Sequence, residues 1–229
     1  MTKVRFLQLN IQKKKHLEKV FQFIKEGDFD LLLLQEIYEE DAKEWAEKLG
    51  YHTYVAKYTH QDKDTVVIFS KLPFVDKEEY YLMAREMEYS SGPGYEFSLL
   101  RANIEVDGKE VVLLSAHLPV HYPGDEVSEY QMVCYKKLKP LLDSFPEFLF
   151  TGDFNTPRGT FIFDDMTTYM TDNIPKEVTT TLDPELHKVG KLFEYVVDAV
   201  FTKGGYVVQD VKLFEGLSDH KGITGVLTV

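Results

Sequence analysis

One short apolar run in this chain ends in polar and acidic residues, and it reads Phe148-Leu149-Phe150-Thr151-Gly152-Asp153-Phe154-Asn155. Three other apolar runs end in the same way, at Asn10, Glu36 and His117. A fifth polar group, Ser218-Asp219-His220, lies just before the last apolar run. Buried strands that each deliver a hydrogen-bonding or ionisable side chain at one end predict a single site where the strand ends converge.

The order of the expected helices and strands indicates two similar halves. In the first half, apolar periodicity predicts strands at residues 4–10 and 30–36 and helices at 16–26 and 39–49. Two antiparallel pairs follow, at 51–58 with 65–70 and at 97–106 with 110–117, and Asp107-Gly108 is the turn expected in the second pair. A helix at 126–143 and strands at 147–151, 193–202, 206–213 and 223–229 complete the pattern.

This order predicts an α/β (α+β) fold in which each half is a sheet with helices on one face. Packing two such sheets face to face gives a four-layer α/β/β/α sandwich of two mainly antiparallel or mixed sheets. With 229 residues, 44 % of them hydrophobic, the chain can bury a full core. No linker-like stretch rich in Pro, Gly and Ser divides it, so we expect a single domain over residues 1–229.

Three long stretches carry no regular pattern, at residues 84–96, 119–125 and 156–181. Loops of this length in compact domains are usually functional or mobile, so we expect them to form walls around a substrate. The side chains that could contact a substrate there are Arg85, Tyr89, Tyr95, His121, Tyr122 and Arg158, with a plain surface position as the alternative. Phe161-Ile162-Phe163 is either a buried anchor for the last loop or a contact to a membrane surface.

The charge balance is acidic, with 26 basic and 38 acidic residues and a net charge of −12. Such a balance opposes a broad electrostatic grip on a nucleic-acid backbone. It does not exclude a phosphate substrate, because clustered carboxylates can hold a cation. One local exception is Lys13-Lys14-Lys15, which is either a phosphate-binding segment or a solvated loop cluster.

The cysteine content and the hydropathy pattern bear on location. Cys134 is the single cysteine and lies in a helical pattern, so no internal disulfide forms and a reducing compartment fits. No apolar stretch approaches the ~20 residues that a membrane span needs. We therefore expect a cytoplasmic protein that is a monomer and does not insert stably into a membrane.

The polar residues at the strand ends suit a hard cation. Glu36, Asp153 and Asp219 offer carboxylate oxygens, and Asn10 and Asn155 offer neutral ones. These donors favour Mg²⁺ or Mn²⁺, whereas no pair of His or Cys has the spacing of a zinc site. Each group alone has a plain structural interpretation, as a strand end, a turn or a core histidine. Asp198 differs, because it lies inside an apolar run and a buried charge there needs a partner.

Taken together, these blocks resemble the endonuclease/exonuclease/phosphatase superfamily, which includes deoxyribonuclease I, apurinic endonucleases, inositol-polyphosphate phosphatases and neutral sphingomyelinases. The resemblance covers nearly the whole chain, and the blocks occur in the family's order. They are Leu9-Asn10, Leu34-Gln35-Glu36, Ser115-Ala116-His117-Leu118, Gly152-Asp153-Phe154-Asn155, Val197-Asp198 and Ser218-Asp219-His220.

The resemblance implies a role for each of these residues. Glu36, helped by Asn10, would hold the divalent ion, and Asp219 would complete the metal side or orient His220. Asp153 and Asn155 would position and deprotonate an attacking water. His220, oriented by Asp198, would contact the phosphoryl oxygens or act as the base. His117 would bind a non-bridging oxygen or protonate the leaving oxygen, with Asp62 or Asp64 as a carboxylate behind it. Substrate contacts would thus come from Asn10, Asn155 and His117.

The activity implied is that of an Mg²⁺- or Mn²⁺-dependent hydrolase that cleaves a phosphomonoester or a phosphodiester by in-line water attack, without a covalent intermediate. Its substrate would be a phosphorylated small molecule, such as a phospho-sugar, an inositol phosphate or a nucleotide, or else a nucleic acid. Two alternatives stay open. One is a DNA endonuclease or exonuclease, and the other is a catalytically silent member that serves as a binding or scaffold module.

Overall fold

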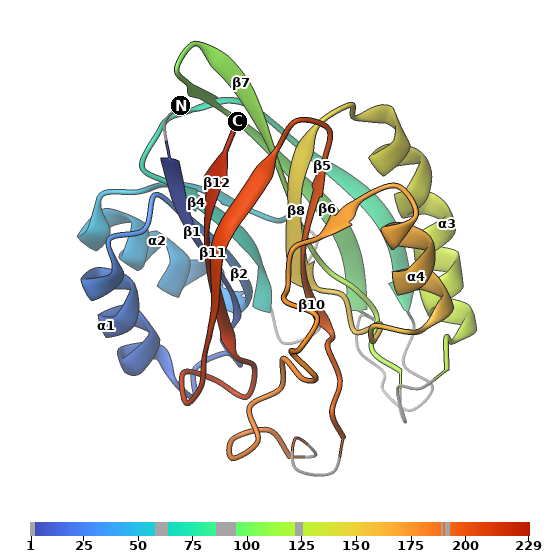
Figure 1. Cartoon of the computed structure of the whole chain (residues 1–229). Coiled ribbons are helices and arrows are strands. Elements are labelled where there is room, and N and C mark those ends of the chain that lie inside the picture. The colour runs from blue at the N-terminus through green and yellow to red at the C-terminus, as the bar shows by residue number, and fades with distance from the viewer. Residues whose placement is uncertain (1–2, 58–63, 86–94, 122–125, 189, 191–192) are drawn as a thin grey trace.

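The computed structural model describes residues 3–57, 64–85, 95–121, 126–188, 190 and 193–229. Within these residues the chain forms two six-stranded sheets. Figure 1 shows the sheets side by side, with helices α1 and α2 outside one sheet and helices α3 and α4 outside the other. The four-layer α/β/β/α sandwich expected from the sequence is confirmed.

The first sheet has the order β11-β12-β1-β2-β4-β3. Its strands are β1 Lys3–Asn10, β2 Leu31–Tyr38, β3 His52–Val55, β4 Asp64–Ser70, β11 Val207–Phe214 and β12 Gly222–Thr228. Strands β1 and β2 pair in parallel, and the other recorded pairs are antiparallel. The helices that cover this sheet are α1 Leu17–Gly27 and α2 Glu39–Leu49.

The second sheet has the order β5-β6-β7-β8-β10-β9. Its strands are β5 Phe74–Arg85, β6 Tyr95–Val106, β7 Lys109–His117, β8 Phe148–Asp153, β9 Thr171–Asp172 and β10 Asp198–Lys203. Strands β7 and β8 are the parallel pair here, as β1 and β2 are in the first sheet. The helices that cover it are α3 Glu129–Ser144 and α4 Phe161–Thr167.

Three apolar layers hold the sandwich together, one between the sheets and one beneath each pair of helices. The continuous apolar run of β2 contributes side chains to two of these layers. Leu31 and Leu33 pack in the layer between the sheets, whereas Leu32 and Leu34 pack against α1 and α2. Because successive side chains of a strand point to opposite faces, the stretch of β2 that is covered on both sides, Leu31 to Leu34, is apolar at every position.

The structure differs from the expected elements in several places. Residues 74–85 form β5, a strand that the sequence analysis did not predict, and residues 161–167 of the expected loop 156–181 form α4. The third helix begins at Glu129 rather than at 126, because Ser128 and Gln131 form a capping box. Strand β10 begins at Asp198, so this residue stands at a strand end and not in the middle of a strand, as the apolar run suggested. Of the expected loop 84–96, the two ends belong to β5 and β6, and residues 86–94 lie outside the described residues.

Among the described residues, no helix combines the length and the apolar character needed to cross a membrane.

Candidate active site

The parallel strand pairs bring the predicted site residues to one end of the sandwich. In the first sheet Asn10 pairs with Gln35, next to Glu36. In the second sheet Asp153 pairs with His117 on one side and with Asp198 on the other. In Figure 1, β1 begins beside the N label, so its last residue lies at the opposite end of the sheet. The polar strand ends therefore meet there, as the sequence analysis expected.

The amide of Asn10 connects the two sheets. Its Nδ2 donates to Oε1 of Glu36 and to Oδ2 of Asp153, at 3.1 Å in each case. Its Oδ1 accepts a hydrogen bond from the backbone N–H of Gln12. Because Asn10 is only 1 % exposed, these bonds form away from bulk water. The two carboxylates that the sequence assigned to metal and to water thus share one amide donor.

The backbone around Glu36 is held in an unusual conformation. Glu36 has a φ of +55°, and the β2–β4 register shifts between Leu34 and Ile37. Gln12 and Lys13, after β1, also have positive φ angles, and the N–H of Lys13 donates to the carbonyl of Glu36 at 2.9 Å. Each such non-glycine residue costs roughly 1–2 kcal/mol of conformational free energy. The bulge turns the Glu36 side chain toward the strand ends instead of leaving it in the alternation of the strand.

The electrostatics at Glu36 favour a cation. Burial raises the pKa of this carboxyl group and the hydrogen bond from Asn10 lowers it, while the nearby carboxylates of Asp64 and Asp219 raise it and the charge of His220 lowers it. Several acids gathered in a partly dehydrated place repel one another. A divalent cation bound by oxygen ligands would relieve this repulsion.

Asp153 is a buried acid of the site, and two histidines lie near its Oδ2. Its Oδ2 lies 3.4 Å from Nε2 of His117 and 3.7 Å from Nε2 of His220. Burial raises the pKa of Asp153, and the two histidines act in the opposite direction. Its Oδ1 accepts the backbone N–H of Asn155 at 3.0 Å, and the Asn155 amide donates to the carbonyl of Leu118. Asn155 itself has a φ of +50°, so the turn after β8 is sharply bent.

Gly152 allows the two central strands of the second sheet to approach. It pairs with Ala116, and a Cβ atom at this position would lie 1.9 Å from the carbonyl oxygen of Ala116. No rotamer change removes a clash with backbone. The glycine in Gly152-Asp153-Phe154-Asn155 therefore sets the separation between His117 and Asp153.

Asp198 and His220 form a buried pair. Oδ2 of Asp198 lies 2.8 Å from Nδ1 of His220, and Oδ1 accepts a hydrogen bond from Nε2 of Gln8 at 3.0 Å. Burial alone would lower the pKa of His220, but the carboxylates of Asp198 and Asp153 raise it well above its usual value of 6.5. His220 is therefore a cation near neutral pH. It is the partner that the buried charge of Asp198 was expected to need.

Gln8 belongs to a polar network under the site that the sequence analysis did not identify. Its Nε2 also donates to Oε1 of Gln35 at 2.9 Å, and Gln35 donates to Oγ of Ser115. Gln8 and Gln35 come from the first sheet, whereas Asp198 and Ser115 come from the second. The network thus links the two sheets next to Asp198.

A second set of bonds places the loop that carries His220. The hydroxyl of Thr181 accepts the backbone N–H groups of Val197 and Asp198, at 3.1 Å each. The backbone N–H of Lys221 donates to the carbonyl of Thr181, and Leu182 forms a bridge with His220. Residues 181–182 therefore connect the start of β10 with the segment before β12.

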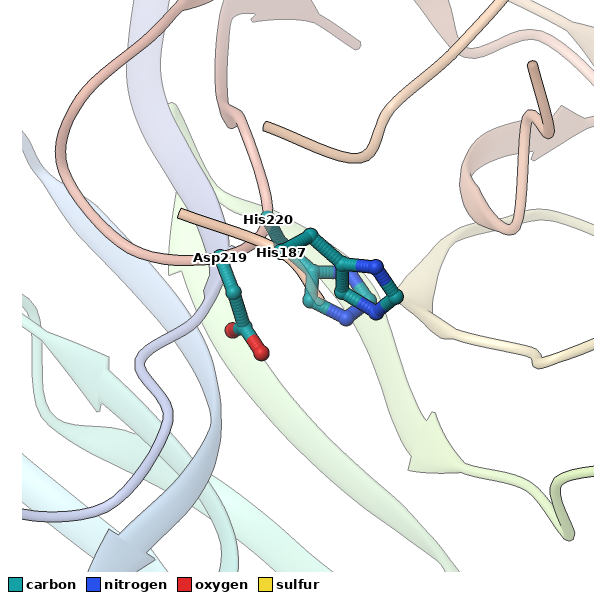
Figure 2. Close-up of side chains that lie close together, drawn as sticks. All are labelled: His187, Asp219 and His220. Carbon is teal, nitrogen blue, oxygen red and sulfur yellow. The ribbon is translucent and has the colours of Figure 1, made fainter. Parts of the chain in front are cut away.

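His187 lies in the site although no sequence motif indicated it. Its ring is 5.9 Å from that of His220, centre to centre, in an edge-on arrangement. Figure 2 shows both rings beside the carboxylate of Asp219, and one ligand atom from each of the three residues lies within 4.8 Å of the others. Burial, followed by the charge of His220, lowers the pKa of His187. His187 is therefore neutral near pH 7 and keeps a nitrogen lone pair.

An open cavity of about 890 Å³ adjoins this end of the sandwich. Glu36, Asp219, His187 and Tyr38 line it, together with Gln12 and four lysines, Lys13, Lys14, Lys15 and Lys188. The loop after β1 and the loop before β10 thus both contribute basic side chains beside the acidic end of the site.

A family model described as the Endonuclease/Exonuclease/phosphatase family matches residues 7–220. The chain belongs to this family. The match includes the ends of β1, β2, β7 and β8 and the start of β10, so it covers all of the strand ends that form the site. No curated protein matches the chain by sequence.

Several solved structures share the fold at low identity. The human Nocturnin catalytic domain with a bound sulfate anion is 13 % identical with a TM-score of 0.77, and the match covers 99 % of this chain and 93 % of that one. The D. rerio TDP2 complex with a single-strand DNA product is 15 % identical with a TM-score of 0.73 and full coverage of both chains, 100 % each. A mannosyl-6-phosphatase from Bacteroides thetaiotaomicron is 15 % identical with a TM-score of 0.70, covering 99 % of this chain and 100 % of that one.

The remaining side chains named from the sequence have different positions. Arg158 donates to Asp172 and to the carbonyls of Ile174 and Val178, so it anchors its own loop, and its contact with a substrate stays a prediction. His121 is half-buried. Three other residues, Asp62, Tyr89 and Tyr122, lie outside the described residues, as do the side chains of Arg85 and Tyr95.

Two further interpretations are resolved in part. Ile162 and Phe163 are buried inside α4, which supports the anchor, whereas Phe161 is 61 % exposed. Asp64 is fully buried, and its carboxylate lies 3.5 Å from Nζ of Lys13. Its role behind His117 stays a prediction.

Proposed function

We propose that this chain is a divalent-metal-dependent phosphoesterase that hydrolyses a phosphomonoester or a phosphodiester by in-line attack of water. The observation that carries the proposal is the arrangement around Asp153. One amide, from Asn10, connects this acid to Glu36, and two histidines, His117 and His220, stand within 3.7 Å of its Oδ2. Side chains that could hold a metal, act as a base and contact a phosphoryl oxygen would thus meet at one place, as phosphoryl transfer requires.

The residues present fit a hard cation. Glu36 and Asp219 would hold Mg²⁺ or Mn²⁺, with the carbonyl oxygen of Asn10 nearby, and the mutual repulsion of these acids supports this assignment. When bound, the ion would supply positive charge at the phosphoryl group and at the developing charge of the leaving oxygen. Neutral His187 is a further donor beside Asp219, whereas His220 is less suited to be a ligand because its pKa is raised.

Asp153 would accept the proton of the attacking water. Burial raises the pKa of this acid, which makes its carboxylate a stronger base than an exposed aspartate. The backbone N–H of Asn155 holds Oδ1, so the other oxygen is oriented toward His117 and His220. Asn155 would thereby position both the base and the water.

His220 and His117 would contact the phosphoryl oxygens. Asp198 keeps His220 cationic and fixes the ring through Nδ1, which leaves Nε2 to donate to an oxygen that gains charge in the transition state. His117 lies on the other side of Asp153, at the end of β7. It would bind a second phosphoryl oxygen or protonate the leaving oxygen.

Two substrate classes are supported to different degrees. The related structures include a mannosyl-6-phosphatase and a TDP2 bound to single-strand DNA. The net charge of −12 opposes an extended hold on a polyanion, so we favour a phosphorylated small molecule over a nucleic acid. A silent scaffold is disfavoured because Glu36, Asp153, Asp198 and His220, whose loss would favour it, are all present. A cytoplasmic location, a monomeric state and a single domain stay predictions.

The direct test is hydrolysis of bis-(p-nitrophenyl) phosphate, p-nitrophenyl phosphate and plasmid DNA with Mg²⁺ or Mn²⁺. We expect turnover that a chelator abolishes and that Asp153→Asn lowers by roughly 10²-fold or more. Asp143→Asn, a change of the same kind on the exposed face of α3, is the control and should retain turnover. Folded protein without metal-stimulated turnover of any of these substrates would contradict the proposal and favour the scaffold.

A further inference from the structure

We propose that the lysine-lined cavity beside Glu36 and Asp219 is a subsite for a second phosphate group of the substrate. The substrate would then be a small molecule with two phosphate groups, one that is cleaved at Asp153 and one that remains bound to the lysines. This inference rests on the proposed function, since it takes the acidic end of the site as the place of the cleaved group. It extends that function by naming the substrate class.

The lysines come from two separate parts of the chain. Lys13, Lys14 and Lys15 follow β1, and Lys188 lies in the loop before β10, yet all four line the same cavity. A run of lysines in one loop is common on protein surfaces, whereas a fourth lysine from a distant segment lining the same cavity is not explained by local sequence. The gathering is also unusual for a chain with a net charge of −12.

The four ammonium groups have different surroundings. Nζ of Lys14 lies 2.7 Å from Glu40 and 4.9 Å from the ring centre of Tyr38, and Nζ of Lys13 lies 3.5 Å from Asp64. For Lys15 and Lys188, no carboxylate of the described residues lies within ion-pair distance. Both of these side chains are exposed. Two cationic groups from separate segments of the cavity lining are therefore available to an anion.

The position of these lysines relative to the catalytic acids is fixed by the backbone. The N–H of Ile11 donates to the carbonyl of Gln35, and the N–H of Lys13 donates to that of Glu36. In the segment that carries Lys188, Asp183 accepts the N–H groups of Leu186 and Gly216, which ties the residues before His187 to the loop that carries Asp219. The hydrogen bonds that position the proposed metal ligands thus also position the segments that carry the lysines. A second phosphate group would therefore be held at a set distance from the cleaved one.

The chemistry favours phosphate on a compact molecule. Lysine ammonium groups are point charges that bind phosphate without demanding one orientation, which suits a flexible substrate. A cavity of about 890 Å³ has room for a phosphorylated small molecule. A nucleic-acid strand would need cationic contacts along its backbone, and the acidic net charge opposes them.

Calorimetric binding of two nucleotide probes tests the subsite. The probes are adenosine 3′,5′-bisphosphate and adenosine 5′-monophosphate, with Mg²⁺ and in the Asp153→Asn background so that neither is consumed. We expect the bisphosphate to bind roughly tenfold more tightly than the monophosphate at low salt. In Lys15→Gln/Lys188→Gln protein this ratio should fall to about threefold or less. In Lys25→Gln/Lys136→Gln protein, which loses two exposed lysines of α1 and α3, the ratio should be retained.

Two outcomes would overturn the subsite. Equal affinity for both probes in the starting protein is one, and an unchanged ratio in the Lys15/Lys188 variant is the other. A ten-nucleotide single strand that binds more tightly than the bisphosphate, and loses that affinity in the same variant, would assign the cavity to nucleic acid and contradict a small substrate. Metal-stimulated hydrolysis of bis-(p-nitrophenyl) phosphate by the wild-type protein is a separate measurement. Failure of the subsite is therefore distinguishable from failure of the proposed function.

Discussion

Oδ2 of Asp198 lies 2.8 Å from Nδ1 of His220, and both side chains are buried. A buried histidine is normally less basic than an exposed one, because burial disfavours its charge. Here the carboxylate reverses that effect and holds the pKa of His220 well above 6.5. The carboxylate of Asp198 therefore keeps the His220 ring cationic beside Asp153.

Asp198→Asn should remove this charge. The pKa of His220 should fall in NMR titrations, and turnover near neutral pH should fall roughly 10²-fold or more. A raised pKa in the folded state stabilises the protein below pH 6.5, and this stabilisation is lost as the pH rises through the raised value. The free energy of unfolding of the metal-free protein should thus decrease with pH above 6.5, and the decrease should be smaller in Asp198→Asn. An unchanged titration of His220 would show that another group charges it.

Gln8→Leu should weaken the contact between the sheets. The substitution removes the hydrogen bonds to Asp198 and to Gln35, and each buried acceptor left without its donor costs about 1–3 kcal/mol. We expect a loss of this order in the free energy of unfolding, measured with urea. Gln22→Leu, at an exposed position of α1, should change it by less than about 0.5 kcal/mol. Similar losses in the two variants would contradict the structural role of Gln8.

Gly152→Ala should be strongly destabilising. A methyl group would meet the carbonyl of Ala116, so β7 and β8 would have to separate, and we expect a loss of roughly 2–4 kcal/mol. Gly108→Ala is the matched comparison, because Gly108 has a φ of +76° and open space around it. There we expect only the backbone cost, about 1 kcal/mol. Equal destabilisation by the two substitutions would show that the close approach to Ala116 does not matter.

Cys134 should be unreactive in the folded protein. Its side chain is fully buried, and burial raises the pKa of the thiol to about 12, so almost no thiolate exists at pH 8. We expect 5,5′-dithiobis(2-nitrobenzoate) to label the protein only as fast as it unfolds, and rapidly in urea. Because the sequence has one cysteine, the labelled fraction reports unfolding directly. Rapid labelling of native protein would place Cys134 at the surface.

The site could be predicted from the sequence to the extent that strand ends carry it. Asn10, Glu36, His117 and Asp153 each terminate an apolar run, and parallel pairing brings such ends together. Asp198 was recognised as a buried acid that needs a partner. Its place at the start of β10 was not, because residues 193–197 look like a strand although they lie outside the sheet.

Other parts could not be predicted because their causes are distant in the sequence. Gln8 and Asp198 are separated by 190 positions, and His187 approaches His220 only because the loop before β10 folds back. Strand β5 follows Pro73 and carries charged residues at Asp76, Lys77 and Glu78, as an edge strand can, so its pattern resembled a loop. Helix α4 has only seven residues, too few for a helical period to stand out.

The central claim is that Glu36 holds a divalent cation which phosphoester hydrolysis requires. The measurement is the rate of bis-(p-nitrophenyl) phosphate hydrolysis against Mg²⁺ concentration in wild-type protein, in Glu36→Gln and in Glu47→Gln, an exposed control on α2. Because the amide has no charge, we expect Glu36→Gln to need roughly tenfold more Mg²⁺ or more, whereas Glu47→Gln should follow the wild type. A metal titration that is the same in all three proteins, or hydrolysis that persists in a chelator, would contradict the account.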